Sequence, residues 1–151
     1  MSENLDLVRT LLSATDPDLI EAARRGEAPV HLVYTEDVVL DLGDFEPPGL
    51  DREYRGLDGA RRYWMDWLGP WAEIEYEAEL HEAGDTVVVV LDQRMRGAHS
   101  GIDLTGRYAQ LFRFRDGKIA YWRIYMNPDD ALADAGIEPG ATAAESFRAG
   151  A

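Results

Sequence analysis

The chain has 151 residues, no cysteine and a formal net charge of −14 at pH 7. Its length is typical of one domain, and its 46% hydrophobic and 10% aromatic residues indicate a folded globule rather than a disordered chain. The charge argues against nucleic acid or an anionic membrane as a partner, because both are negative themselves. The lack of cysteine excludes disulfides, thiolate nucleophiles and Cys-ligated metals.

The sequence also predicts a cytoplasmic protein that works without a cofactor. No segment has the roughly 18 apolar residues of a membrane span, and the N-terminus lacks the basic start of a signal peptide. No Gly-rich phosphate loop occurs. His31, His81 and His99 lie far apart in the sequence, so we expect no metal site.

Three helices are predicted in the first part of the chain. Apolar residues at helical spacing predict an amphipathic helix over residues 5–15. Asp16 is suited to cap a second helix, which has Pro17 at its first position and ends at residue 26. A short third helix is expected over residues 29–34.

The next segment contains a strand, a loop and the clearest helix of the chain. Residues 37–42 predict a strand with a polar interruption at Asp41, and residues 43–53, which contain Pro47-Pro48-Gly49, predict a loop or an irregular hairpin. Asp58 is suited to cap the helix that follows. Its apolar stripe consists of Ala60, Tyr63, Trp64, Trp67, Leu68 and Trp71.

A meander of consecutive antiparallel strands follows. The apolar and β-branched runs span residues 74–82, 86–96, 102–115 and 118–126. Asp116-Gly117 between the last two is among the strongest short-range signals for a hairpin. A last helical turn is expected over residues 128–135. Residues 137–151, rich in Ala and Gly, are predicted to form a flexible tail after a domain of residues 1–136.

Because the helices come first and the long strands last, the predicted class is α+β rather than alternating α/β. A strongly twisted sheet of this kind can curl around the aromatic stripe of the Trp-rich helix. That arrangement predicts a conical cavity between helix and sheet.

Three segments carry a resemblance to a known family: Tyr34–Val39, Tyr54–Ala60 and Phe112–Ile119. In this order and spacing they resemble the nuclear transport factor 2-like superfamily, and within it the SnoaL-like branch. The resemblance implies a cone-shaped barrel, in which a highly curved, mainly antiparallel sheet wraps around N-terminal helices. It also implies a homodimer formed through the convex face of the sheet and a pocket for a small-molecule ligand.

The resemblance leaves two classes of function open, because this fold carries both enzymes and non-catalytic domains. The first hypothesis is cofactor-free acid–base catalysis on a small hydrophobic or cyclic metabolite, of the isomerase, cyclase, hydratase or hydrolase type. The second is a dimeric domain for ligand binding or association that catalyses no reaction.

Asp41 and Arg107 are the predicted catalytic residues, as base and as stabiliser of a developing negative charge. In the family the first strand commonly ends with a pocket acid, and Arg107 aligns where ketosteroid isomerase relatives keep a protonated Asp. Strict alternation along the strand, however, places Asp41 with Val39 on the outward face. For Arg107 the alternative is a surface side chain paired with a carboxylate.

The predicted ligand-binding residues are aromatic and polar side chains on the helix and the strands. The aromatic ones form a pocket wall for a flat or cyclic ligand, although a stripe at helical spacing is more often the packed core of the fold. Asn127 lies nearest to the position where SnoaL-type cyclases keep an acid, and alternation turns either Gln93 or Arg94 toward the cavity. The predicted set is Tyr63, Trp64, Trp67, Gln93, Trp122 and Asn127.

Overall fold

The computed structural model describes residues 3–12, 17–43, 45, 49–68, 71–97, 103–138 and 140–150. Its helices are α1 (Glu3–Leu12), α2 (Pro17–Arg24), the short 3-10 helix η1 (Val30–Leu32), α3 (Gly56–Leu68) and α4 (Pro128–Asp134). Its strands are β1 (Tyr34–Asp41), β2 (Glu53–Arg55), β3 (Trp71–Ala83), β4 (Thr86–Gly97), β5 (Asp103–Arg115), β6 (Lys118–Tyr125) and β7 (Glu145–Gly150). The fold is therefore α+β, as the order of elements predicts.

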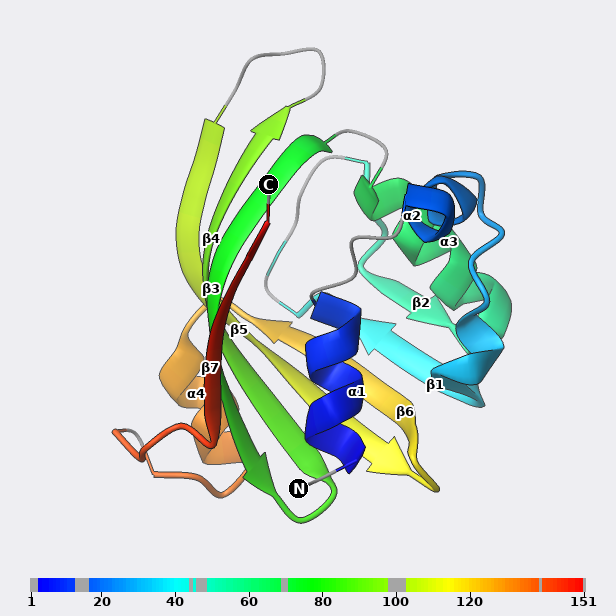
Figure 1. Cartoon of the computed structure of the whole chain (residues 1–151). Helices are drawn as coiled ribbons and strands as arrows, with labels where there is room; N and C mark the ends of the chain where they lie inside the picture. Colours follow the sequence, from blue (N-terminus) through cyan, green and yellow to red (C-terminus); the bar gives the residue numbers. More distant parts are fainter. Residues whose placement is uncertain are drawn as a thin grey trace.

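The seven strands form one curved sheet in the order β2-β1-β6-β5-β4-β3-β7 (Figure 1). All neighbours are antiparallel except β1 and β6, which run parallel. The predicted hairpin at Asp116-Gly117 is confirmed. Both residues have positive φ, 54° and 80°, as a type I′ turn requires.

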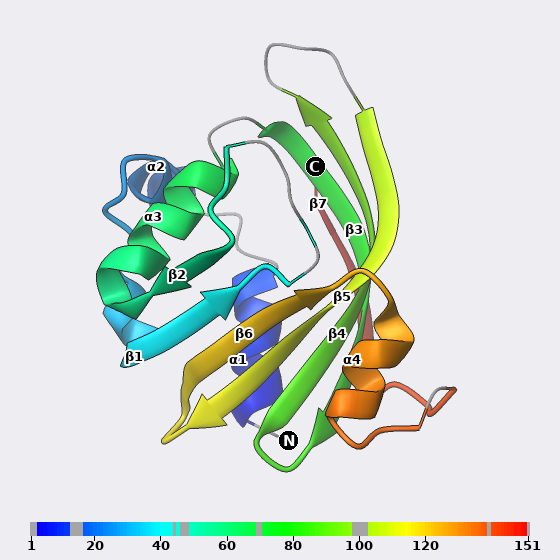
Figure 2. The same ribbon diagram turned by 180° about the vertical axis from the view of Figure 1, so that it is seen from behind.

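The two faces of the sheet bury different clusters. The inner face, which includes Val87, Val89 and Leu91 of β4, packs against α1 and α3 in the larger core. The outer face, which includes Val88 and Val90, packs against α4 in a smaller one. Figures 1 and 2, which are opposite views, show α1 and α4 on opposite sides of the sheet. Where the pairing is regular, a strand residue is thus assigned to a face by its alternation with these valines.

The C-terminal segment differs from the expected flexible tail. Glu145–Gly150 pairs antiparallel with β3 as an edge strand of the sheet. Phe147 packs edge-on against Tyr76, with ring centroids 6.3 Å apart. The strand therefore gains backbone partners and one aromatic contact despite its Ala- and Gly-rich surroundings.

Other differences lie at element boundaries. The helix ends at Leu68 rather than at Trp71, which instead begins β3. Part of the segment expected as a loop forms β2, which pairs with the end of β1. The proposed cap Asp16 and residues 98–102, between the second and third predicted strands of the meander, lie outside the described residues. No helix in the described ranges combines the length and the apolarity needed to cross a bilayer.

Candidate functional site

A chain of polar side chains crosses the inner face over β6, β5 and β4. The indole Nε1 of Trp122 donates to Oε1 of Gln110 at 3.3 Å. Nε2 of Gln110 donates to the hydroxyl of Tyr108 at 3.4 Å. That hydroxyl donates to Oε1 of Gln93, which is buried at 7% exposure. Polar groups thus extend from the aromatic wall to the middle of the sheet.

The direction of this chain follows from its first member. An indole N–H can only donate, so Gln110 must turn its carbonyl oxygen toward Trp122 and its NH₂ group toward Tyr108. The Tyr108 hydroxyl accepts that bond and places its own hydrogen toward Gln93. Gln93 therefore uses its oxygen here and keeps Nε2 for another partner.

The chain of polar side chains ends at two groups that lack hydrogen-bond partners among the described residues. Nε2 of Gln93 and the hydroxyl of Tyr76 are both buried and find no hydrogen-bond partner among the described residues. Tyr76 lies directly opposite Gln93 in the β3–β4 register, and Gly106 lies opposite it in β5. A Cβ added to Gly106 would meet no atom of the described residues within 4 Å, so there is open space at Gly106, the register partner of Gln93. Because buried polar groups are nearly always hydrogen-bonded, this place is chemically incomplete.

Aromatic rings line the other end of the chain. The Tyr63 ring lies 5.1 Å from Trp122, 5.4 Å from Trp64 and 5.6 Å from Tyr54, centroid to centroid. Nε1 of Trp64 donates to the hydroxyl of Tyr34 at 3.0 Å. Trp67 lies further along α3 and packs edge-on against Phe45 at 6.3 Å. The structure therefore brings Tyr63, Trp64 and Trp122 together.

Burial controls the protonation of the inner-face tyrosines. It raises the pKa of Tyr76 to about 12. Burial also raises the pKa of Tyr108, although the hydrogen bond from Gln110 partly opposes this. The pKa of Tyr63 lies well above the ordinary value of 10 for the same reason. These hydroxyls are neutral at physiological pH and are suited to hydrogen bonding rather than to acting as bases.

Asp41 lies on the outer face, which is the alternative that strict alternation along the strand predicts. Its Oδ1 accepts from the backbone N–H of Gly43 at 2.8 Å, and its Oδ2 accepts from the hydroxyl of Tyr121 at 3.2 Å. Tyr121 packs against the outer cluster, whereas Leu40 and Leu42 on either side of Asp41 belong to the inner one. Strict alternation, rather than the family pattern, describes this strand.

Arg107 also lies on the outer face, where Nη1 is 3.0 Å from Oδ2 of Asp92. Both side chains are about half exposed, at 54% and 53%. Through the β1–β6–β5 register Asp41 is level with Leu111, two strands away and four residues from Arg107. Strand geometry separates them by roughly 16 Å. The structure does not bring the two predicted catalytic residues together.

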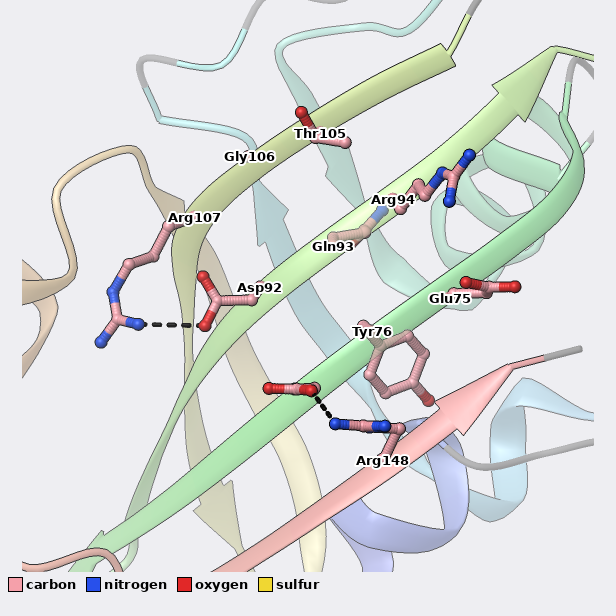
Figure 3. Close-up of a pocket in the computed structure, with 10 residues that line it drawn as sticks. Glu75, Tyr76, Asp92, Gln93, Arg94, Thr105, Gly106, Arg107 and Arg148 are labelled. Carbon is pink, nitrogen blue, oxygen red and sulfur yellow. Dashed lines mark hydrogen bonds and ion pairs between the residues drawn. The ribbon is translucent and has the colours of Figure 1, made fainter.

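Arg107 borders an open depression of about 640 Å³ on the sheet (Figure 3). A row of charges crosses it through direct register partners, in the order Arg107, Asp92, Glu77 and Arg148. Arg107 pairs with Asp92, and Arg148 pairs with Glu77. The charges along the row thus neutralise one another, and exposed pairs of this kind contribute little to stability.

Asn127 is the N-cap residue of helix α4. Its Oδ1 accepts from the backbone N–H of Asp129 at 3.0 Å and so caps α4.

The residues that sequence reasoning missed are Tyr76, Tyr108 and Gln110. The available signal was period-two spacing, because Tyr108 and Gln110 are polar residues on the same strand face as Phe112 and Phe114. Within the described residues no group of three His, Asp or Glu side chains is placed to hold a metal ion.

Solved structures share this fold at low sequence identity. An NTF2-like protein of unknown function from Burkholderia pseudomallei is 23% identical, with a TM-score of 0.63 over 88% of this chain and 97% of that chain. A candidate SnoaL-like polyketide cyclase from Mesorhizobium loti is 16% identical, with a TM-score of 0.54 over 72% and 92%. TerC, crystallised with polyporic acid, is 17% identical, with a TM-score of 0.61 over 89% and 98%.

A comparison with curated proteins finds no match. The SnoaL-like domain family, in contrast, matches residues 18–122, which is more than half of the chain. This segment runs from α2 to β6 and contains the whole inner-face polar chain. The chain therefore has the fold of NTF2-like proteins and belongs to the SnoaL-like domain family.

Proposed function

We propose that the protein binds a small, largely apolar cyclic metabolite against the inner face of its sheet. The observation that carries the proposal is the end of the polar chain. There, Nε2 of Gln93 and the hydroxyl of Tyr76 are buried without partners beside the open space at Gly106. Leaving such groups unpaired is costly, and a ligand that supplies a partner recovers this cost. Next to it, the ring of Tyr76, which packs edge-on against Phe147 with centroids 6.3 Å apart, offers apolar surface for the rest of the ligand.

The positions of the charged residues favour binding over acid–base catalysis by the predicted pair. Asp41 and Arg107 are separated from this site by the sheet itself. Their catalytic roles stay predictions, and they would require a substrate on the outer face. We therefore expect Asp41→Asn to leave ligand binding at the inner face unchanged.

The test is to fill the open space while leaving the opposite face as a control. In Gly106→Leu a side chain occupies the space beside Gln93, whereas in Thr105→Leu the same side chain points to the outer face. The probes are indane, a fused-ring hydrocarbon, and polyporic acid, with which the similar protein TerC was crystallised. Binding is measured by ligand-observed NMR and calorimetry.

The expected result is that the wild-type protein and Thr105→Leu bind at least one probe, and that Gly106→Leu loses at least tenfold in affinity. Circular dichroism and thermal unfolding establish that both variants are folded. Equal affinity of the two variants would place the ligand elsewhere. A lack of binding to both probes by the wild-type protein would refute the proposal.

A further inference from the structure

We infer that the inner-face site selects its ligand by the direction of hydrogen bonding: it takes ring compounds that present an acceptor oxygen, such as a ketone. Compounds of the same shape that present only a donor are rejected. This inference rests on the proposed function and adds the chemical class of the ligand. It is carried by the order of donors and acceptors between Trp122 and Gln93.

Each link of the chain restricts the next. Trp122 has no acceptor, so Gln110 cannot rotate its amide without placing two N–H donors against each other. With the Gln110 amide held in this way, the Tyr108 hydroxyl receives a hydrogen and must donate its own to Gln93. Rotation of the Gln93 amide would then oppose its NH₂ group to that hydrogen. The free end of Gln93 is therefore a donor, which needs an acceptor from the ligand.

The hydroxyl of Tyr76 does not weaken this selection. A hydroxyl rotates and can both donate and accept, so it adapts to either kind of ligand group. Directly opposite Gln93 it can donate to the same oxygen as Nε2. The selectivity thus comes from Gln93, and Tyr76 adds strength to the bond with an acceptor.

The carboxylate of Glu145 lies on the same face of the sheet but does not compete with a ligand for the free amide of Gln93. Glu145 of β7 is level with Leu80, four residues along β3 from Tyr76. Strand geometry puts these rows roughly 13 Å apart. Nη1 of Arg9 lies 3.4 Å from Oε1 of Glu145. A small ligand at Gln93 is therefore beyond the reach of this acceptor.

Three bicyclic compounds of nearly equal size separate the possibilities. 1-Indanone carries an acceptor oxygen, indole carries an N–H donor, and indane carries neither. In the wild-type protein we expect 1-indanone to bind roughly tenfold more tightly than indole, because indole leaves the buried donor unpaired. Indane pairs with neither Gln93 nor Tyr76 and is expected to bind no more tightly than indole. Dissociation constants are measured by calorimetry, with ligand-observed NMR for the weaker complexes.

Two variants test the chain of hydrogen bonds from Trp122 to Gln93. Gln93→Leu removes the donor that distinguishes them, so the affinities for 1-indanone and indole are expected to converge within about twofold. Gln110→Leu keeps Gln93 but frees the hydroxyl of Tyr108 to turn, so Gln93 can present either end and the preference for 1-indanone over indole falls. Thr105→Val, on the outer face of the same strand, is the control and should keep the wild-type order. Thermal unfolding checks that each variant is folded.

The outcomes separate this inference from the proposed function. Equal wild-type affinities for the three compounds overturn the acceptor preference but leave ring binding intact. An unchanged preference in Gln93→Leu also overturns it, because the selecting group would then lie elsewhere. A lack of binding by all three compounds overturns both. A tenfold preference that disappears in Gln93→Leu and shrinks in Gln110→Leu, but not in Thr105→Val, supports the inference.

Discussion

Two Tyr→Phe substitutions should change stability in opposite directions, because the two hydroxyls differ in their partners. In Tyr76→Phe the removed hydroxyl is buried and has no partner among the described residues. In Tyr54→Phe the removed hydroxyl donates to Oδ2 of Asp66 at 2.7 Å and accepts from the backbone N–H of Asp51 at 2.9 Å. Both changes keep the aromatic ring, so packing is nearly constant between them.

The magnitudes follow from this difference. An unpaired buried hydroxyl costs about 1–3 kcal/mol, so Tyr76→Phe is expected to stabilise the folded protein by about 1 kcal/mol. The Tyr54 hydroxyl makes one hydrogen bond to a backbone amide and one to a carboxylate, and both hydrogen bonds are only partly buried. Its loss is expected to destabilise the fold by about 2 kcal/mol.

Urea unfolding at 25 °C, followed by circular dichroism and tryptophan fluorescence, gives both free energies of unfolding. The same Tyr76→Phe protein is expected to bind 1-indanone more weakly, because one donor is gone. A stability loss in Tyr76→Phe as large as that in Tyr54→Phe would show that the Tyr76 hydroxyl already has a partner in the unliganded protein. That result would refute the reasoning about an incomplete site.

Two further predictions concern the first strand and its surroundings. Gly43→Ala is expected to destabilise the fold by about 3 kcal/mol in urea unfolding, and Gly84→Ala by only about 1 kcal/mol. Both glycines have φ of +59°, but a Cβ at Gly43 would lie 2.4 Å from the carbonyl oxygen of Ile124. Equal losses would contradict this steric argument. The hydrogen bond from Arg115 lowers the pKa of Asp37 to about 2, so its stabilising effect is present above the ordinary pKa of about 3.8 and is lost as pH falls toward 2. NMR titration should show this pKa returning to the ordinary range in Arg115→Gln, and an unchanged value would assign the shift to another group.

Local patterns predicted most of the fold. The hairpin at Asp116-Gly117 needs two residues that adopt positive φ between two apolar strands. Both the turn residues and the flanking strands are adjacent in the sequence, so a local pattern predicts them. The parallel pairing of β1 with β6 joins segments about 80 residues apart in the chain. The pairing of β7 with β3 depends on an edge that exists only after the sheet has formed. Such long-range pairings leave no local pattern, so sequence reasoning missed them.

The candidate site was predicted in part for a related reason. Tyr63, Trp64, Trp122 and Gln93 could be singled out because large or polar residues stand out in apolar segments, and their role in ligand binding stays a prediction. For Asp41 the family pattern and strict alternation pointed to opposite faces, and the structure agrees with alternation. The partners of Gln93 were missed because a hydrogen-bond chain depends on cross-strand register, which is set by tertiary structure.

The chemistry of the two sheet faces explains why a ligand site here uses amides and hydroxyls. The outer face of β4 and β5 carries Asp92 and Arg107, which remain half exposed and keep their hydration. The inner face carries Gln93 and Tyr108, neutral groups whose burial costs far less than that of an ion. Neutral groups are weak bases but keep their direction as donors once a neighbour such as Trp122 orients them. An inner face built in this way recognises the oxygen of a ring compound by geometry rather than by charge, and a net charge of −14 on the chain then need not repel a neutral ligand.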